Sequence, residues 1–309
     1  MTDKSIFIAG DWGTSNLRLY LCQMSSDWEA TILDTQFGPG ISQLNRDFED
    51  TLFRLIQDWL DQYESAPVIL SGMIGSTIGW KDAPYLKCPV GVDDIAQGRV
   101  SFNARGIEIS ILAGLRTENP LGAPDVMRGE ELQMLGWMKT QNSATTRQLF
   151  ALPGTHNKWT LVESDRITNF LTAFTGELYA LLRSNSILIS EEKPISFNKE
   201  LFMQGVEAVQ SLGGAHLVHA LFATRSKQVL GEMASSDASS YLSGLITAAD
   251  ILGATTLFQI QEPVMVIGEP ALADHYVTAL NHFGWQAQTC APAEIAVAGF
   301  AAVYQQLHK

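Results

Sequence analysis

The sequence predicts an α/β protein built from two related lobes. Apolar runs of strand length alternate with stretches of helical spacing along the chain, which is typical of α/β folds. The pattern Gly-Thr-x-Asn occurs at 13–16 and again at 154–157, each time in a predicted hairpin near the start of a half. A chain of 309 residues is also longer than one hydrophobic core usually serves.

The first half opens with strands 5–10 and 17–22, which flank a polar turn at 11–16. Apolar residues at helical spacing then predict a helix over 48–63, with Asn45 as its N-cap. Further strands are expected at 67–70 and 107–112, and a helix at 126–139.

The second half opens with strands 148–152 and 159–162, again around a polar turn. The remaining predicted elements are helices at 175–187, 199–223, 238–252, 271–283 and 293–307 and strands at 264–267 and 286–290. Two prolines and a glycine in 116–124 indicate a boundary. We therefore expect an N-terminal lobe at 1–122 and a C-terminal lobe at 123–309.

Composition excludes several classes of protein. A net charge of -13 and a pI near 4.8 oppose binding to nucleic acid or an anionic membrane. The three cysteines form no C-x-x-C pair, so neither a disulfide framework nor a zinc cluster is predicted. The sequence shows no signal segment and no stretch of the roughly 18 apolar residues that a membrane span needs. We expect a cytoplasmic protein with no membrane partner.

Two polar turns carry the residues that a metal-bound triphosphate needs. In the first, Asp11 ends a strand and Gly13, Thr14, Ser15 and Asn16 follow, so a carboxylate stands beside a compact turn of N–H donors. The second, 154–158, has the same kind of turn. Each turn alone also fits an ordinary hairpin, because these residue types favour turns for local reasons.

Three other segments carry polar groups near predicted element ends. Arg128, Glu130 and Glu131 lie at a predicted helix start, where acids also favour the helix dipole. A glycine-rich stretch at 71–76 precedes Trp80 and Tyr85, which suit a sugar but also an ordinary surface turn. Gly268-Glu269-Pro270 follows a strand, where the glycine would let a nucleotide approach and the proline would start a helix. The sequence has no Walker phosphate loop, dinucleotide fingerprint or His-Glu-x-x-His site.

Several of these blocks together resemble the 2-dehydro-3-deoxygalactonokinase family, sugar-acid kinases with the actin, hexokinase and chaperone-ATPase fold. The resemblance runs nearly end to end. The matching blocks are 11–18 (DWGTSNLR), 72–76 (GMIGS), 79–81 (GWK), 83–86 (APYL), 126–131 (VMRGEE), 153–159 (PGTHNKW) and 175–178 (TGEL).

The resemblance implies that ATP, with Mg²⁺, phosphorylates the 6-hydroxyl of 2-dehydro-3-deoxy-D-galactonate in D-galactonate catabolism. It implies two ribonuclease-H-like lobes with mixed sheets flanked by helices and with ATP in the cleft between them. The first phosphate loop and the sugar-acid site would lie in the N-terminal lobe, and the second phosphate loop and the nucleotide site in the C-terminal lobe.

The resemblance also assigns roles to individual residues. Asp11 looks like the metal-associated catalytic acid, and either Glu130 or Glu131 like the acid that orients the acceptor hydroxyl. The candidate nucleotide-binding residues are Gly13, Thr14, Ser15, Asn16, Gly154, Thr155, His156 and Gly268. The candidate substrate-binding residues are Arg18, Gly72, Met73, Trp80, Tyr85, Arg128 and Lys158.

Some questions stay open at this point. Related sequences carry a small turn where this chain has Gly268-Glu269-Pro270, and Glu269 would either repel phosphate or bind a ribose hydroxyl. A phosphate-ester or polyphosphate hydrolase and an ATP-regulated interaction module share this fold and are the alternatives to a kinase. The sequence leaves open the C4 configuration of the substrate and whether the protein is a homo-oligomer.

Overall fold

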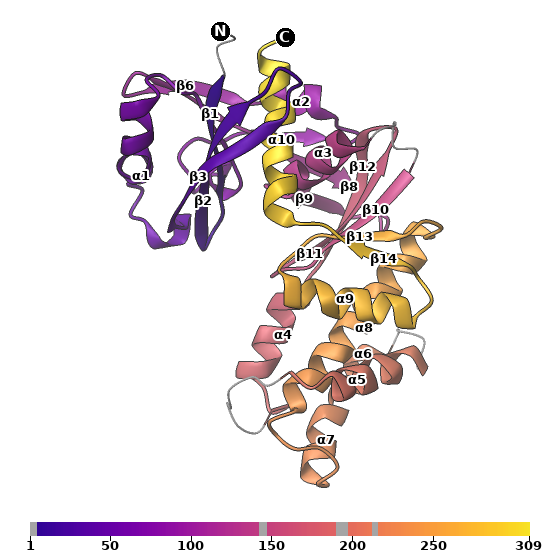
Figure 1. Ribbon diagram of the computed structural model, residues 1–309. Helices are drawn as coiled ribbons and strands as arrows, with labels where there is room; N and C mark the ends of the chain where they lie inside the picture. The colour runs from indigo at the N-terminus through magenta and orange to yellow at the C-terminus, as the bar shows by residue number, and fades with distance from the viewer. Residues whose placement is uncertain (1–4, 142–146, 190–196, 212–215) are drawn as a thin grey trace. The chain divides into compact units, whose positions relative to one another are not determined.

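The computed structural model describes residues 5–141, 147–189, 197–211 and 216–309, which form two compact units (Figure 1). Unit 1 comprises Met1–Arg147, Val162–Asn169 and Ala291–Lys309, and unit 2 comprises Gln148–Leu161 and Phe170–Cys290. The sequence predicts a single boundary, after residue 122. In the structure the chain passes between the units more than once, because the tip of one hairpin and the C-terminal helix belong to unit 1.

Unit 1 is built on a six-stranded mixed sheet with the strand order β3-β2-β1-β4-β7-β6. The first three strands are antiparallel, β4 runs parallel to β1, β7 runs parallel to β4, and β6 is antiparallel to β7. The strands are β1 (Ile6–Trp12), β2 (Asn16–Met24), β3 (Ala30–Pro39), β4 (Val68–Ser71), β6 (Val100–Ala104) and β7 (Ile107–Ile111). A second sheet contains β5 (Tyr85–Lys87), β8 (Gly114–Glu118) and β9 (Pro124–Met127). The helices are η1 (Ile41–Gln43), α1 (Phe48–Gln62), η2 (Met73–Gly75), α2 (Val92–Gln97), α3 (Glu131–Thr140) and α10 (Pro292–Leu307).

Helices cover both faces of the strand β1. Ile8 and Trp12 pack in a core with α1, where the Trp12 ring meets Phe48 edge-on at 5.9 Å. The neighbouring residue Phe7 points to the opposite face and stacks on Tyr304 of α10 at 4.6 Å. A strand buried on both sides needs apolar residues at successive positions, which explains the continuous run at the start of the chain.

The helices α3 and α10 approach each other closely enough that their backbones touch. A Cβ atom added to Gly136 would lie 1.8 Å from the carbonyl oxygen of Ile295, and one added to Gly299 would lie 2.1 Å from that of Leu132. Only glycine fits at either position. This crossing holds the C-terminal helix in unit 1.

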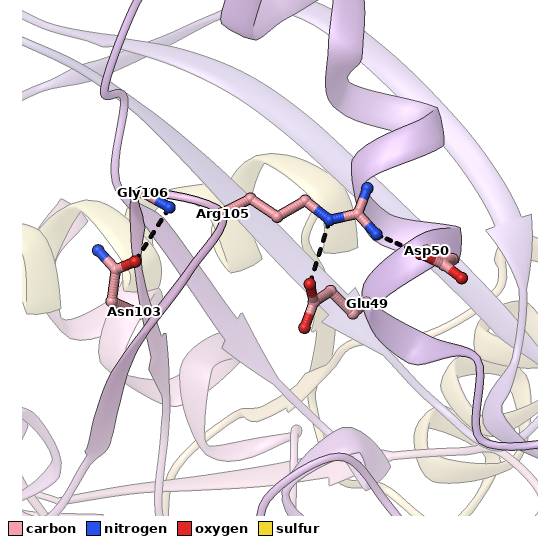
Figure 2. Close-up of polar contacts among 5 residues, drawn as sticks. All are labelled: Glu49, Asp50, Asn103, Arg105 and Gly106. Carbon is pink, nitrogen blue, oxygen red and sulfur yellow. Dashed lines mark hydrogen bonds and ion pairs between the residues drawn. The ribbon is translucent and has the colours of Figure 1, made fainter.

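A glycine-containing turn joins β6 to β7 and is tied to α1 (Figure 2). Arg105, at a φ of 50°, pairs with Glu49 at 3.1 Å and with Asp50, and its guanidinium lies over the Phe53 ring. The side chain of Asn103 accepts a hydrogen bond from the N–H of Gly106 and closes the turn. These exposed ion pairs hold the β6–β7 turn, at the edge of the sheet, against α1. None of their residues is a predicted site residue.

Unit 2 repeats the strand order of unit 1. Its sheet has the order β12-β11-β10-β13-β14, which corresponds position by position to β3-β2-β1-β4-β7, and β13 again runs parallel to its neighbours. The strands are β10 (Arg147–Leu152), β11 (Asn157–Glu163), β12 (Arg166–Ala173), β13 (Val264–Val266) and β14 (Ala287–Thr289). The helices are α4 (Thr175–Ser184), α5 (Lys199–Ser211), α6 (Leu217–Leu221), α7 (Ala223–Val229), α8 (Ala238–Phe258) and α9 (Pro270–His282). The predicted α/β class with mixed sheets and flanking helices is confirmed.

The helix α8 forms the centre of unit 2 and packs against α5, α9 and the strands (Figure 1). Gly205 of α5 and Gly244 of α8 face each other's backbones, since added Cβ atoms would lie 2.3 Å and 2.0 Å from carbonyl oxygens of the opposite helix. Among the described residues, α8 is the one helix long and apolar enough to cross a membrane by length and composition, so the expectation of no such stretch was wrong. The most apolar window of α8 is 67% buried inside the protein, which makes its apolarity that of a core helix.

Four predicted elements differ from the structure. The helix expected at 238–252 continues to Phe258 as α8. The helix expected at 126–139 begins only at Glu131, because 124–127 is the strand β9 and Gly129 turns the chain at a φ of 111°. The helix expected at 199–223 is α5 followed by α6 and α7, and its residues 212–215 lie outside the described chain. The N-cap of α1 is Asp47 rather than Asn45.

Candidate active site

In unit 1, several predicted site residues meet at the carboxyl ends of β1 and β4. Asp11 on β1 pairs in register with Ser71 on β4, and Gly72 follows directly. Gly72 and Gly129 have φ angles of 91° and 111°, and a Cβ on Gly129 would lie 3.3 Å from the Gly72 Cα and 4.0 Å from Asp11 Oδ1. The two glycines therefore bring two backbones together beside one carboxylate.

The Asp11 carboxylate is open enough to meet a ligand. Its side chain is 40% exposed and lies 3.6 Å from the Arg18 guanidinium, which is itself 52% exposed. Desolvation raises the pKa of Asp11, and the positive charge of Arg18 opposes that shift.

The first polar turn is held from one side. The N–H of Gly13 donates to the Asn16 carbonyl at 2.9 Å, while the carbonyls of Gly13, Thr14 and Ser15 accept hydrogen bonds from the segment 40–43. The side chains of Thr14, Ser15 and Asn16 are exposed. Within the part of the chain that the structure describes, the N–H groups of Thr14 and Ser15 have no acceptor, so these donors remain for an anion.

The adjacent acids Glu130 and Glu131 have different surroundings. Glu131 is fully buried, where its Oε2 accepts from the Gly129 N–H at 2.7 Å and its Oε1 from Ser71 Oγ at 3.1 Å. Burial, and then the charge of Glu130, raise the pKa of Glu131 to about 8, so it is protonated at neutral pH. Glu130 is the N-cap residue of α3 and is half-buried. Glu131 joins the two glycine segments, and Glu130 is the more accessible acid.

Arg128 is a buried cation at the edge of the same cluster. Its Nη2 donates to the Ala83 carbonyl at 2.7 Å, and its guanidinium stacks 4.2 Å from the ring of Tyr85, which is 37% exposed. Its Nε and Nη1 have no hydrogen-bond partner among the described residues, and no carboxylate there pairs with it. Gly75 leaves room for this head group, because a Cβ there would lie 2.7 Å from Nη1.

Three other predicted substrate residues have different surroundings. Met73 is half-buried in η2, and Trp80 packs edge-on against Phe102 at 5.0 Å, on the side of the unit 1 core. Lys158 belongs to unit 2 and is buried, with its Nζ donating to Thr172 Oγ1 at 2.6 Å. The Lys158 ammonium is therefore turned into the unit 2 sheet.

In unit 2, the second polar turn packs against the start of α4. The Glu177 N–H donates to the Thr155 carbonyl at 2.9 Å, and His156 Nε2 lies 2.6 Å from Glu177 Oε2. A Cβ on Gly176 would lie 2.2 Å from the Gly154 carbonyl oxygen, so only glycine allows this approach. Sequence reasoning did not single out Gly176 and Glu177 as site residues, although both stand in the 175–178 block.

The turn Gly268-Glu269-Pro270 starts α9. Glu269 is the N-cap residue and its carboxylate accepts from the Leu272 N–H at 3.1 Å, while Pro270 occupies the first helical turn. A Cβ on Gly268 would lie 3.1 Å from the carbonyl oxygen of Pro153, so this turn touches the residue that directly precedes the second polar turn. The unusual carboxylate at 269 is thus accounted for by a local capping role.

The second polar turn, through Gly154, and the first turn of α9, through Ala271 and Leu272, border a cavity of about 690 Å³ within unit 2. Gly154, Gly176, His275 and Tyr276 are among its lining residues, and serines and threonines of α8 supply further polar groups. Phe197 stacks on His275 at 4.1 Å and also lines it. A cavity of this volume, apolar with a few polar groups, is in the range of ligand sites.

The described residues contain no cluster of three His, Cys, Asp or Glu side chains that would form a protein-only metal site. Mg²⁺ in nucleotide sites needs only one or two carboxylates, because phosphate oxygens and water complete its octahedron. A single accessible acid such as Asp11 fits that requirement.

The structure therefore gathers the predicted residues into two groups. Asp11, Gly72, Glu131 and the 13–16 turn lie together in unit 1, with Arg128 and Tyr85 adjoining. The 154–156 turn and Gly268 lie together in unit 2. Sequence reasoning missed Gly129 as a close-approach glycine. It also missed the segment 40–43, because the hydrogen bonds by which this segment supports the first turn correspond to no sequence motif.

Comparison with known proteins agrees with this geometry. The sequence matches the family described as 2-keto-3-deoxy-galactonokinase over residues 11–303. It is 32% identical to a 2-dehydro-3-deoxygalactonokinase of Escherichia coli (strain K12) over 279 residues, covering 90% of each chain. It is 30% identical to a probable 2-dehydro-3-deoxygalactonokinase of Rhizobium meliloti (strain 1021), covering 98% of this chain and 97% of that one.

Solved structures show the same likeness. A crystal structure from Sinorhizobium meliloti, provisionally identified as a 2-dehydro-3-deoxygalactonokinase, matches with a TM-score of 0.83 and 29% identity over 97% of this chain and 96% of that one. Component A of the (R)-2-hydroxyglutaryl-CoA dehydratase of Acidaminococcus fermentans matches with a TM-score of 0.55 at 13% identity, which is a likeness of fold alone. Since the family match spans nearly the whole sequence and the relatives are aligned over nearly their full length, the chain belongs to the 2-keto-3-deoxy-galactonokinase family of phosphotransferases.

Proposed function

We propose that the protein transfers the γ-phosphoryl group of ATP to the 6-hydroxyl of 2-dehydro-3-deoxy-D-galactonate, in the catabolism of D-galactonate. The Escherichia coli relative is named as a kinase of this compound and the Rhizobium meliloti relative as a probable one, and this chain shares the motif blocks of the family. A hydrolase or an ATP-regulated module of the same fold is not favoured by these relatives.

The observation that carries the proposal is the cavity of unit 2 beside the second polar turn. Its volume of about 690 Å³ is sufficient for a nucleoside triphosphate. Gly154 opens onto it from the turn, and Thr175 at the start of α4 and Ala271 near the start of α9 also line it. Phosphates in the cavity would therefore lie near two helix N-termini. We assign Gly154, Thr155, His156 and Gly268 to the nucleotide.

Unit 1 supplies the groups that act on metal and acceptor in this proposal. Asp11 would hold Mg²⁺ through water, and bound Mg²⁺ neutralises charge on the phosphates. The N–H groups of the 13–16 turn would bind phosphate oxygens. Glu130 would accept a hydrogen bond from the 6-hydroxyl and align it for attack, because Glu131 is buried and protonated.

Arg128 is the residue we assign to the substrate carboxylate. A buried guanidinium with two unpartnered nitrogens lacks the anion that would usually compensate it. A carboxylate that accepts a hydrogen bond from Nη1 or from Nε would supply it, after a small displacement of the partly exposed Tyr85 ring. We prefer Arg128 to Lys158, whose ammonium already has a hydroxyl partner inside the sheet.

The test of the proposed function is ADP release from Mg·ATP with three additions: 2-dehydro-3-deoxy-D-galactonate, its gluconate epimer, and no acceptor. We expect release with the galactonate derivative, slower release with its epimer, and little without acceptor. Equal use of both acids would remove the C4 preference and keep the reaction, whereas release that ignores both acids would indicate a hydrolase.

A second experiment tests the role of Arg128. Arg128→Gln should raise the KM for the sugar acid by about tenfold or more, the effect of losing a charged hydrogen-bonded pair, while the KM for ATP stays unchanged. The matched control is Arg105→Gln, which removes an arginine of the same unit that is engaged in exposed ion pairs (Figure 2). A normal sugar-acid KM in Arg128→Gln would contradict the assignment.

The remaining expectations stay part of this proposal. The acidic composition favours a small-molecule substrate rather than nucleic acid or an anionic membrane as partner. We expect the enzyme to act in the cytoplasm, and its oligomeric state is to be measured by light scattering.

A further inference from the structure

One carboxylate in unit 2 has no place in the sequence motifs, yet three donors converge on it. Asp250, in the second half of α8, accepts hydrogen bonds from Asn157 Nδ2 at 2.7 Å, Trp159 Nε1 at 2.8 Å and Tyr276 Oη at 2.6 Å. All three donor residues are buried, with at most 2% of their surface exposed. A solvated acid on a helix surface does not collect three buried partners.

The donors come from the parts of unit 2 that border the cavity. Asn157 is the first residue of β11 and directly follows His156 of the second polar turn. Tyr276 belongs to α9 and is one of the residues that line the cavity. The Asp250 carboxylate thus connects the turn, through Asn157, to the cavity wall, through Tyr276.

This arrangement requires an acceptor at position 250. A carboxylate accepts at both oxygens and donates at neither, so it can take all three hydrogen bonds. The indole N–H of Trp159 can only donate, so the atom opposite it, Oδ1 of Asp250, must be an acceptor. Burial raises the pKa of Asp250. The hydrogen bonds from Tyr276, Asn157 and Trp159 oppose that shift, because they stabilise the charged carboxylate.

The turn that Asn157 follows has little freedom of position. Gly154 lies against Gly176, where no Cβ fits, and the Thr155 carbonyl accepts the Glu177 N–H. A small displacement of the turn would therefore break the contacts with α4 or move Gly154 away from the cavity. Donors that are already held in place bind phosphate more tightly, because the turn loses little conformational entropy on binding.

We propose that Asp250 is a positioning residue for the nucleotide: by holding Asn157 and Tyr276 on one carboxylate, it sets the position of the 154–156 turn relative to the cavity wall. This inference rests on the proposed function, since it takes the cavity to be the nucleotide site. Asp250 itself touches neither nucleotide nor acceptor in this role.

The test is the variant Asp250→Asn, which keeps the size of the side chain but places an NH₂ group among three donors. Tyr276 can rotate its hydroxyl and Asn157 can turn its amide to accommodate that group, so the fold is retained while the spacing of turn and wall changes. We expect the Kd of Mg·ADP, measured by calorimetry, and the KM for ATP to rise about tenfold, and the KM for the sugar acid to stay unchanged.

The matched control is Val209→Ala, a buried position of α5 in the same core that does not line the cavity. It should lower the melting temperature without changing the Kd of Mg·ADP. A purely structural Asp250 would behave in the same way, so a wild-type Kd in Asp250→Asn at a lowered melting temperature would overturn the inference.

A second variant decides the case if Asp250→Asn does not fold. Tyr276→Phe removes one donor and leaves the carboxylate, and we expect a rise of about threefold in the Kd of Mg·ADP. An unchanged Kd there would also overturn the inference. Failure of the wild-type chain to bind Mg·ADP would instead refute the proposed function itself, so the two failures are distinguishable.

Discussion

The buried acid Glu131 makes the stability of unit 1 depend on pH, and Glu131→Gln should remove that dependence. In the folded chain the carboxyl is shielded from water and its pKa is about 8, against an ordinary value of 4.5. A glutamine can offer its Oε1 to the Gly129 N–H and its NH₂ to Ser71 Oγ, because a hydroxyl can also accept. The substitution therefore keeps both contacts and deletes the titration.

The direction and size follow from the two pKa values. The folded-state pKa is raised, so the contribution of Glu131 to stability is fully present below about pH 4.5 and is lost as the pH rises toward 8. Between pH 5 and pH 8 the unfolded chain gives up a proton that the folded chain mostly keeps, which costs the wild type about 3 kcal/mol. Glu131→Gln should lack this loss. Its free energy of unfolding, relative to that of the wild type, should therefore rise by the same amount between pH 5 and pH 8.

The assay is urea denaturation at several pH values between 5 and 8, with hydrogen exchange of peptides from β1 and β4 as the signal for unit 1. The two units need not unfold together, so a global signal alone would mix them. Glu108→Gln, an exposed glutamate of β7, makes the same chemical change at the surface and gives the baseline. Parallel pH profiles for the wild type and Glu131→Gln would refute the reasoning, since they would mean that Glu131 ionises in the folded protein as it does in the unfolded one.

Three further substitutions test the packing and the chemistry. Gly129→Ala should destabilise unit 1 by about 1–3 kcal/mol in thermal denaturation, because its φ is 111° and its Cβ would meet the neighbouring backbone; Gly106→Ala, at a φ of 85° with open space around it, separates the backbone strain from that contact. Gly244→Ala should lower the free energy of unfolding of unit 2 by about 1–3 kcal/mol or more, since its Cβ would lie 2.0 Å from the backbone of α5. The control is Gly253→Ala in the same helix, whose Cβ meets no atom within 4 Å and which should be neutral or stabilising. Equal melting temperatures for these two variants would contradict the close crossing. Asp11→Asn should abolish turnover in the ADP-release assay and leave the melting temperature unchanged, and normal kinetics in that variant would remove Asp11 from the metal site.

Sequence periodicity predicts the elements that have one apolar face and clear ends. The hairpin β1–β2, the helix α1 and the strand β4 were all expected within a few residues, because their apolar positions report directly which face is buried. The repeat of Gly-Thr-x-Asn predicted two related lobes, and the two units share a strand order.

Other features depend on partners that are distant in sequence. The strand β3 has no fully buried residue, so no periodic pattern marks it, and it exists because β2 offers a free edge. The end of β9 and the start of α3 meet at Gly129, whose positive φ a pattern of apolar residues does not reveal. The strands β5 and β8 are likewise made by pairing rather than by pattern.

The candidate site shows the same division. Residues in contiguous motifs, such as Asp11 with the 13–16 turn and 154–156, could be proposed from the sequence together with its family resemblance. Asp250 could not, because nothing around it in the sequence indicates that Asn157, Trp159 and Tyr276 will meet there. The distinction between Glu130 and Glu131 also needed the structure, since only burial separates two adjacent glutamates.

The return of α10 to unit 1 affects the order in which the protein can fold during synthesis. Phe7 and Gly136 belong to surfaces that are completed by Tyr304 and Gly299, which leave the ribosome only after every segment of unit 2. Unit 2, although it begins later in the chain, can therefore reach its final packing first. Until translation reaches α10, one face of the β1 sheet stays uncovered, and the nascent chain is most vulnerable to aggregation in that interval.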